Sequence, residues 1–564
     1  MAQKIPQIRN QMYISPELVA IKIERKPHEA RFFKYIADVL NLNLYKRFIT
    51  GALPYSRRIL IAVILYAMYK GYYSARSIIK FSEDSIGATW ILNGMDMPGY
   101  KTVERTINDF IEEIDNVFVQ ILSICEKLSL IGKERIYMDG VKIKANASKH
   151  KAMSYSHLTK KITKGNNDLE LLYSELKSSI DCLESLSDVE MNELIKKESK
   201  KVHDFLRKEH EKALKIKEEE TFNIDLNPEE NKEKSEINYD ILNKKSKILK
   251  SIDDEEKYEN TLEKLNNVAF IEKRVNKMED AKIELENKWK EKNGTKKIPE
   301  KKQINFTDSN SAIMVTKHQG VQQCYNNFAI VDDKSNIILG THTNNNASDQ
   351  LGLIPAIEDA KKLFGSLEGF QFGADAGFFS AENILYLEEN KIDYYISFPE
   401  SKSRYGKDKF VYDSYTDTYK CPEGNILTMQ KQLKGGKVRE YSNKDACASC
   451  DHRDNCTRAK DGMKKIERDM INDNIREQAR EKARSPEGRE VLRLRKTIPE
   501  PVWGNIKTQD GLIQLHYRGN DKTSPEFKLH CIMQNLRKIL KVYFNSKSYQ
   551  VTVHNVENEK QLSA

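Results

Sequence analysis

The sequence predicts a mixed α/β protein made of several parts, and three observations indicate this class. The 564 residues exceed what one hydrophobic core usually holds, so several domains are expected. Helix-period runs fill residues 1–130, and short β-rich runs alternate with helical runs on both sides of a long Lys- and Glu-dominated segment. Four cysteines gather within residues 421–456. We therefore expect an α/β core, an N-terminal all-α domain, a long helical insertion and a small cysteine-bearing insertion.

Composition and charge set limits on the class of protein. Hydrophobic residues make up 39% and charged residues 31%, which favours long exposed helices around a modest core. The net charge of +9 permits a polyanionic partner without requiring one. The most apolar run, residues 59–69, is too short and too closely flanked by Arg and Lys to span a membrane. We expect a cytoplasmic protein with reduced cysteines.

The N-terminal segment predicts several helices joined by tight turns. Residues 54–84 have a helical pattern that breaks at Gly71 and restarts at Ser74, and residues 98–122 form a further helix. Two interpretations stay open, a helix-turn-helix-like DNA reader and a plain helical bundle with a basic surface. The cations that favour the first are Arg57, Arg58, Arg76, Lys80, Lys101 and Arg105.

Residues 151–305 predict long amphipathic helices. No Gly and a single Pro, Pro228, occur between positions 166 and 293, and apolar residues recur every three or four positions in 262–289. This pattern is typical of antiparallel coiled-coil hairpins. The segment is either an arm that touches DNA or a partner subunit, or a plain insertion with charged faces, which is the simpler interpretation.

The remaining segments predict the α/β core. A strand is expected at 130–145, and further elements follow after residue 310. These are a hairpin (327–344), a helix stopped by Gly365 (348–365), a strand, turn and helix (370–391), a strand (392–399), a basic helical segment (465–500) and a last helix (525–545).

Three carboxylates stand at positions where the expected core elements could bring them together. Asp139 stands where the first strand is expected to end, although Asp139-Gly140 also reads as an ordinary turn. The next core strand is expected to end at Asp375 in FGADAGF, and a helix is expected to contain Glu500 in TIPEPVWGNIK. Two aspartates at adjacent strand ends and a glutamate on a crossing helix are hard oxygen ligands that suit Mg²⁺ or Mn²⁺. Two such ions could activate a water or a 3′-hydroxyl and stabilise the leaving oxygen of a phosphodiester.

The spacing of the two aspartates agrees with this order. They are 236 residues apart, of which the helical insertion accounts for most. What remains is the length that one hairpin, one helix and one strand need.

Four segments carry a resemblance to a known family. They are MDGVKIKANASKHKAMSY (138–155), GADAGFFSAENILYLEENKID (373–393), IPEPVWGNIKTQDGLIQLHYRG (498–519) and HCIMQNLRKIL (530–540). The chain resembles DDE transposases of bacterial insertion sequences, in particular the subgroup with an N-terminal helical domain and a cysteine cluster before the catalytic glutamate. The resemblance implies an RNase H-like catalytic core that binds two Mg²⁺ or Mn²⁺ ions through Asp139, Asp375 and Glu500. It also implies double-stranded DNA as substrate, a homodimer or larger assembly on element ends, and a place at the bacterial nucleoid.

Cations near the glutamate match the family only in part. Relatives often place Tyr and Arg seven and four residues before the glutamate and Lys seven after it, where this chain has Arg493, Lys496 and Lys507. The Lys matches and the other two do not. We expect Arg493 and Lys496 on the same helical face as Glu500, where they could hold phosphates.

Two further pairs of cations are expected to contact DNA. Lys142 and Lys144 follow Asp139 on one strand face, which would meet either the substrate or solvent. Arg57 and Arg58 belong to the N-terminal helices.

The cysteine cluster predicts a structural zinc site. Cys447 and Cys450 have knuckle spacing, and Cys421 and Cys456 flank them across an expected hairpin. Tetrahedral Zn²⁺ would take these four thiolates, or three of them with His452. The alternative is a set of loosely buried thiols. The other cysteines are scattered at positions 125, 182, 324 and 531.

These expectations define six segments and three possible activities. The segments are an N-terminal DNA-binding domain (1–130), the first core parts (131–150 and 306–404), the helical insertion (151–305), the zinc-binding insertion (405–460), the last core part with the glutamate helix (461–545) and a tail (546–564). The favoured activity is DNA transposition. The alternatives are a catalytically silent repressor and a stand-alone metal-dependent endonuclease, and the complete acid trio argues against the repressor.

Overall fold

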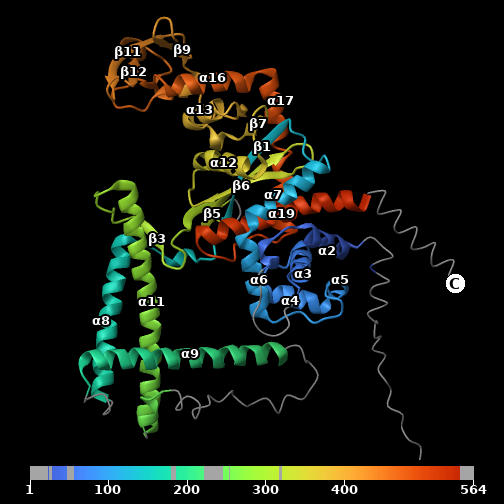
Figure 1. Ribbon diagram of the computed structural model, residues 1–564. Helices are drawn as coiled ribbons and strands as arrows, with labels where there is room; N and C mark the ends of the chain where they lie inside the picture. Colours follow the sequence, from blue (N-terminus) through green and yellow to red (C-terminus); the bar gives the residue numbers. More distant parts are fainter. Residues whose placement is uncertain are drawn as a thin grey trace, which may run out of the picture. The chain divides into compact units, whose positions relative to one another are not determined.

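Figure 1 shows the protein as a computed structural model. It describes residues 23, 28–46, 56–179, 186–220, 246–252, 254–316 and 320–545. The chain divides into two compact units, residues 1–146 with 313–564 and residues 147–312. Each is described by itself, and the expected tail at 546–564 and Cys182 lie outside the described residues.

Helices form the N-terminal part of the first unit, as predicted. They are α2 (Glu29–Val39), α3 (Arg57–Tyr69), α4 (Ala75–Asp84), α5 (Ile86–Ile91), α6 (Tyr100–Glu112) and α7 (Ile114–Lys127). Helix α3 is central, because its side chains are buried on every side from Leu60 to Met68. Gly71 adopts φ +92° after α3, and the Ser74 hydroxyl accepts the Ser77 N–H at 3.1 Å to cap α4. In the described part of the chain no helix is long and apolar enough to cross a bilayer.

A mixed sheet forms the centre of this unit. Its strands are β1 (Arg135–Lys144), β4 (Ala312–Thr316), β5 (Gly320–Asp332), β6 (Ile338–Asn344), β7 (Gln371–Ala374) and β8 (Asp393–Ile396). The order is β4-β5-β1-β7-β8, with β6 also paired to β5. Strand β5 is antiparallel to β1 and β6, whereas β1, β7 and β8 run parallel.

Helices cover this sheet. They are α12 (Leu353–Phe364), α13 (Ala381–Glu389), α16 (Asn472–Arg484), α17 (Pro486–Arg495), α18 (Pro499–Thr508) and α19 (Asn520–Asn545). Helix α12 packs so closely on β6 that a side chain at Gly340 would lie 2.4 Å from Ala360. Helix α17 covers the other face, where Val491 and Tyr137 share a buried cluster. The buried Asn535 side chain of α19 exchanges hydrogen bonds with the backbone of Ile338 at 2.8 and 2.9 Å.

A second sheet carries the cysteine cluster and precedes α16 in the chain (Figure 1). Its strands are β9 (Val411–Asp413), β10 (Thr418–Lys420), β11 (Ile426–Leu433), β12 (Val438–Ser442) and β13 (Ile466–Asp469), with the short helices α14 (Lys444–Ala448) and α15 (Arg453–Cys456). All neighbouring strands are antiparallel. The expected helical run at 465–500 was therefore wrong in two respects: residues 466–469 are a strand, and the rest is divided into separate helices.

The second unit is helical, as its composition predicted. It contains α8 (Tyr155–Ser179), α9 (Asp188–Glu220), α11 (Glu255–Asn293) and the two-stranded pair β2 (Ala152–Ser154) and β3 (Gln303–Asn305). Helices α8 and α11 are antiparallel, because Leu158 clusters with Leu285 and Leu176 clusters with Leu262. Helix α9 crosses this pair (Figure 1).

Candidate active site

The strand register sets Asp139 and Asp375 side by side. Met138 of β1 pairs with Ala374 of β7, and each aspartate is the next residue. Because β1 and β7 are parallel and alternate their side chains together, both carboxylates lie on one face of the sheet. Strand β1 confirms the strand expected at 130–145. It continues to Lys144, so a strand end at Asp139 and the turn interpretation were both wrong.

Local backbone contacts hold both carboxylates. The Asp139 Oδ1 accepts its neighbour's Gly140 N–H at 2.9 Å, and the Asp375 Oδ1 accepts the Gly377 N–H at 2.8 Å. The second contact begins the short 3₁₀ helix η6 (Ala376–Phe378) immediately after β7. Gly140 is a glycine for steric reasons, since a side chain there would lie 2.8 Å from the Phe328 ring.

The environment of Asp139 favours its neutral form. Burial raises the pKa of Asp139 to about 6, and the negative charge of Asp375 acts in the same direction. The Gly140 N–H, the Arg495 guanidinium and the Trp503 indole act against this rise. A cation bound between the two adjacent carboxylates would balance their negative charge.

Arg495 and Trp503 complete this face, and sequence reasoning missed both. Arg495 Nη1 lies 4.0 Å from Asp375 Oδ2. Trp503 is buried, and its Nε1 has no hydrogen-bond partner of normal geometry, although it lies near enough to Asp139 to favour the charged carboxylate. The signal that could have found Trp503 is its position three residues after Glu500, on the same face of one helix.

Glu500 lies in the first turn of α18, which packs against β1. Its side chain is exposed, and among the described residues it forms no hydrogen bond or ion pair. Trp503, whose indole acts on the pKa of Asp139, lies on the same face of α18 as Glu500. The structure thus brings the two aspartates together and places Glu500 on the helix beside them.

The cations near Glu500 are arranged differently from the prediction. Arg493 belongs to α17, which ends at Arg495, whereas α18 begins at Pro499, so one shared helical face was wrong. Arg493 forms a bidentate pair with Glu490 at 2.9 Å. Lys496 is the C-cap residue of α17, and its side chain is exposed, as is that of Lys507 in the last turn of α18.

The other expected DNA contacts lie away from this face. Strand alternation puts Lys142 and Lys144 on the opposite face of β1 from Asp139, with no bulge in the register. Their expected contact with DNA stays a prediction. Arg57 forms a shielded ion pair with Asp109 at 2.5 Å, and Arg58 donates to the Asp38 carbonyl at 2.8 Å. Both arginines thus tie the helical domain together.

The four clustered cysteines line one small cavity of about 30 Å³. The Cys421 Sγ accepts the Asn425 N–H at 3.3 Å, and the charges of the other three thiols act on the pKa of Cys456, which burial raises. In the described residues no three Cys, His, Asp or Glu side chains already surround one metal position. His452 does not line the cavity, and its Nε2 lies 3.7 Å from Glu423. This donor set fits four-thiolate Zn²⁺ better than three thiolates with His452.

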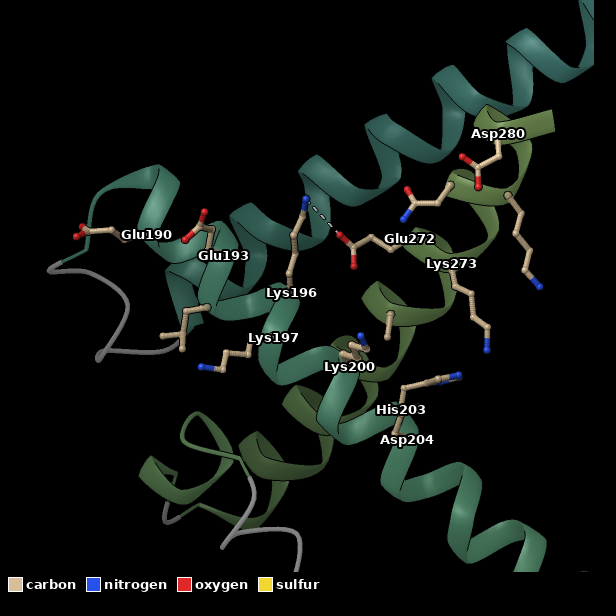
Figure 2. Close-up of a pocket in the computed structure, with 14 residues that line it drawn as sticks. Glu190, Glu193, Lys196, Lys197, Lys200, His203, Asp204, Glu272, Lys273 and Asp280 are labelled. Atoms are coloured by element: carbon tan, nitrogen blue, oxygen red, sulfur yellow. Dashed lines mark ion pairs between the residues drawn. The ribbon is translucent and has the colours of Figure 1, made fainter. Parts of the chain in front are cut away.

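A separate groove lies between α9 and α11 in the helical unit, and its volume is about 970 Å³ (Figure 2). Lys196 on α9 forms an ion pair across the groove with Glu272 on α11, and the two charged atoms are 3.4 Å apart. The groove is lined by five lysines, five carboxylates, one histidine and three uncharged residues, so its charges balance. It offers no excess of positive charge for a polyanion.

Comparison with known proteins agrees with this site in part. Residues 420–540 match the family described as Transposase DDE domain. No curated protein and no solved structure matches the chain. The matched segment contains the cysteine cluster, α18 and Glu500, whereas Asp139 and Asp375 lie before it. The chain therefore carries a transposase DDE domain, which implies phosphoryl transfer on DNA.

Proposed function

We propose that this protein is the DNA transposase of a bacterial insertion sequence, with Asp139, Asp375 and Glu500 as its catalytic carboxylates. The observation that carries the proposal is the β1–β7 register, which sets the two aspartates side by side next to the helix of Glu500. The match to a transposase DDE domain supports it independently, because the match covers Glu500 but neither aspartate.

The carboxylates fit a divalent cation. Hard oxygen ligands suit Mg²⁺ or Mn²⁺, and Asp139, whose pKa burial raises, lies beside a second carboxylate, Asp375. Two ions, when bound, supply the activation of a water or 3′-hydroxyl and the stabilisation of the leaving oxygen. Asp139 and Asp375 would hold them from the sheet, and Glu500 from α18. Arg495 would stay beside Asp375 as a rigid cation facing the scissile phosphate.

The other parts of the chain have supporting roles in this proposal. The mixed sheet acts as an RNase H-like core. A structural Zn²⁺ bound by Cys421, Cys447, Cys450 and Cys456 stabilises the cysteine-bearing sheet, which has only a small apolar core. The exposed Lys496 and Lys507 hold DNA phosphates near the catalytic face. The protein binds the terminal repeats of its element as a homodimer or larger assembly.

The test is cleavage of a plasmid that carries the element's own ends, with Mg²⁺ or Mn²⁺. The wild type is compared with Asp139→Ala, Asp375→Ala and Glu500→Ala, and with Asp333→Ala as a control for loss of a carboxylate just beyond the end of β5. We expect all three active-site variants to bind the ends and to lose cleavage, and the control to cut.

Two other results would replace the proposal. Binding of the ends without cleavage by the wild type would establish a repressor. Cleavage without transfer of a labelled end into a target plasmid would establish a stand-alone endonuclease.

A further inference from the structure

A fourth carboxylate, Asp349, lies beside the proposed centre. It opens the 3₁₀ helix η5 (Asp349–Gly352), which follows β6 and precedes α12. A methyl group at Gly377 would lie 2.9 Å from Asp349 Oδ2 and 2.9 Å from Asp375 Oδ1. The two carboxylate oxygens are therefore separated by less than twice that distance. Arg495 faces the other oxygen of Asp375, so the charges flank this side chain from two directions.

Asp349 is held in this place by the sheet. Asn326 of β5 is fully buried, and its Nδ2 donates to Asp349 Oδ1 at 2.7 Å. The η5 helix is also wedged against the core, since a side chain at Gly352 would lie 2.4 Å from the Phe328 ring. The same ring blocks any side chain at Gly140, next to Asp139. These contacts fix η5 relative to the sheet and so place Asp349 beside the Asp375 turn.

No other contact explains the charge of Asp349. Among the described residues it forms no ion pair, and its side chain is half-buried. A carboxylate left without a cation next to a second carboxylate costs free energy unless a positive charge arrives. The Asn326 Oδ1, also buried, has no hydrogen-bond partner, so the amide is oriented by the two contacts of its Nδ2, with Asp349 and with the Asn346 carbonyl at 3.1 Å.

We propose that Asp349 is a positioning residue of the catalytic centre. Its carboxylate, held by Asn326, supports the Gly377 turn that orients Asp375 and adds negative charge that strengthens binding of the divalent cation. The inference rests on the proposed function, because it assumes that Asp375 is a cation ligand.

The Asp349→Asn variant removes the negative charge of residue 349 and keeps the size and shape of its side chain. The new amide oxygen can still accept the Asn326 N–H, whereas the negative charge is gone. We expect the dissociation constant for Mn²⁺ to rise on the order of tenfold, the effect of one unit charge a few ångströms from a doubly charged ion in a water-like dielectric. The midpoint of thermal unfolding without Mn²⁺ should stay unchanged. Free Mn²⁺ is measured by its electron paramagnetic resonance signal during titration of the full-length protein.

Three reference variants make the result decisive. Asp375→Asn should abolish the Mn²⁺ binding, and Asp333→Asn, a half-buried carboxylate beyond the far end of β5, should leave it unchanged. Asn326→Ala should weaken Mn²⁺ binding, and its combination with Asp349→Asn should weaken it no further, because Asn326 acts through Asp349.

The outcomes distinguish the inference from the function on which it rests. Loss of binding in Asp375→Asn with wild-type affinity in Asp349→Asn would overturn the role of Asp349 and leave the catalytic centre in place. Wild-type affinity in Asp375→Asn as well would overturn both. Weaker binding in Asp349→Asn together with a lower unfolding midpoint would show a structural role and also overturn the inference.

Discussion

Arg468 offers a sharp test of how the cysteine-bearing sheet is held to the core. Its side chain is 1% exposed, and it pairs with Glu477 of α16 through two hydrogen bonds of 2.6 and 2.7 Å. It also donates to the Tyr419 hydroxyl at 3.0 Å, and its guanidinium lies 3.6 Å from the centre of the Tyr412 ring. One buried cation thus joins three strands of the sheet to the helix that leads toward Glu500.

The Arg468→Met change keeps the volume and removes the charge. Breaking a buried ion pair by removing one partner costs about 3–5 kcal/mol. Glu477 is 37% exposed and can be hydrated again, which places the expected cost at the lower end, about 3 kcal/mol. Arg439, directly opposite Arg468 in the sheet, has a half-exposed ion pair with Asp417 at 2.7 Å, so Arg439→Met should cost much less than Arg468→Met.

Hydrogen exchange is the appropriate assay, because a chain with several parts does not unfold in one step. The free energy of opening is measured for amides of β10, β12 and β13 in the wild type and both variants. A loss of less than about 1 kcal/mol in Arg468→Met, or equal losses in both variants, would refute the view that this arginine anchors the sheet.

Three further predictions concern stability and metal. Gly340→Ala should destabilise the core by about 1–3 kcal/mol in urea unfolding, because its new methyl group would lie 2.4 Å from Ala360 on α12. The hydrogen bond to Glu526 raises the pKa of His516, so their contact should stabilise the protein below the ordinary histidine pKa and lose this effect as pH rises through the raised value. Glu526→Gln should flatten that dependence in thermal unfolding between about pH 5 and 8. Removal of Zn²⁺ by a chelator should unfold β9–β13 and leave α19 protected in hydrogen exchange.

Much of the fold follows from local signals in the sequence. Gly71 and Ser74 divided two N-terminal helices correctly, and Gly365 ended α12 at φ +110° as its position indicated. The end of α17 was missed although Pro499, at the start of α18, is a recognised signal that one helix ends and another begins. Strand β13 was missed because four residues between a polar loop and a helix carry too little pattern.

The candidate site was predictable in its residue types and not in its geometry. Asp139 was found from an apolar run followed by Asp-Gly, yet the pairing of β5 continues the strand for five residues beyond it. Arg495 and Asp349 gave no signal, because their contacts with the Asp375 turn depend on tertiary packing. Strand alternation also explains the position of Lys142 and Lys144, which lie three and five residues after Asp139 and therefore on the other face of β1.

The long separation of Asp139 and Asp375 in sequence has a structural explanation. The helical unit leaves the core after β1 and returns before β4, and the cysteine-bearing sheet leaves after β8 and returns at α16. Neither insertion interrupts the Met138–Ala374 pairing or the packing of Tyr137 against Val491. The relative position of the two carboxylates therefore depends on a few adjacent residues of β1, β7 and α17. Insertions at these two points can change in length and content while the geometry that the proposed chemistry requires stays the same.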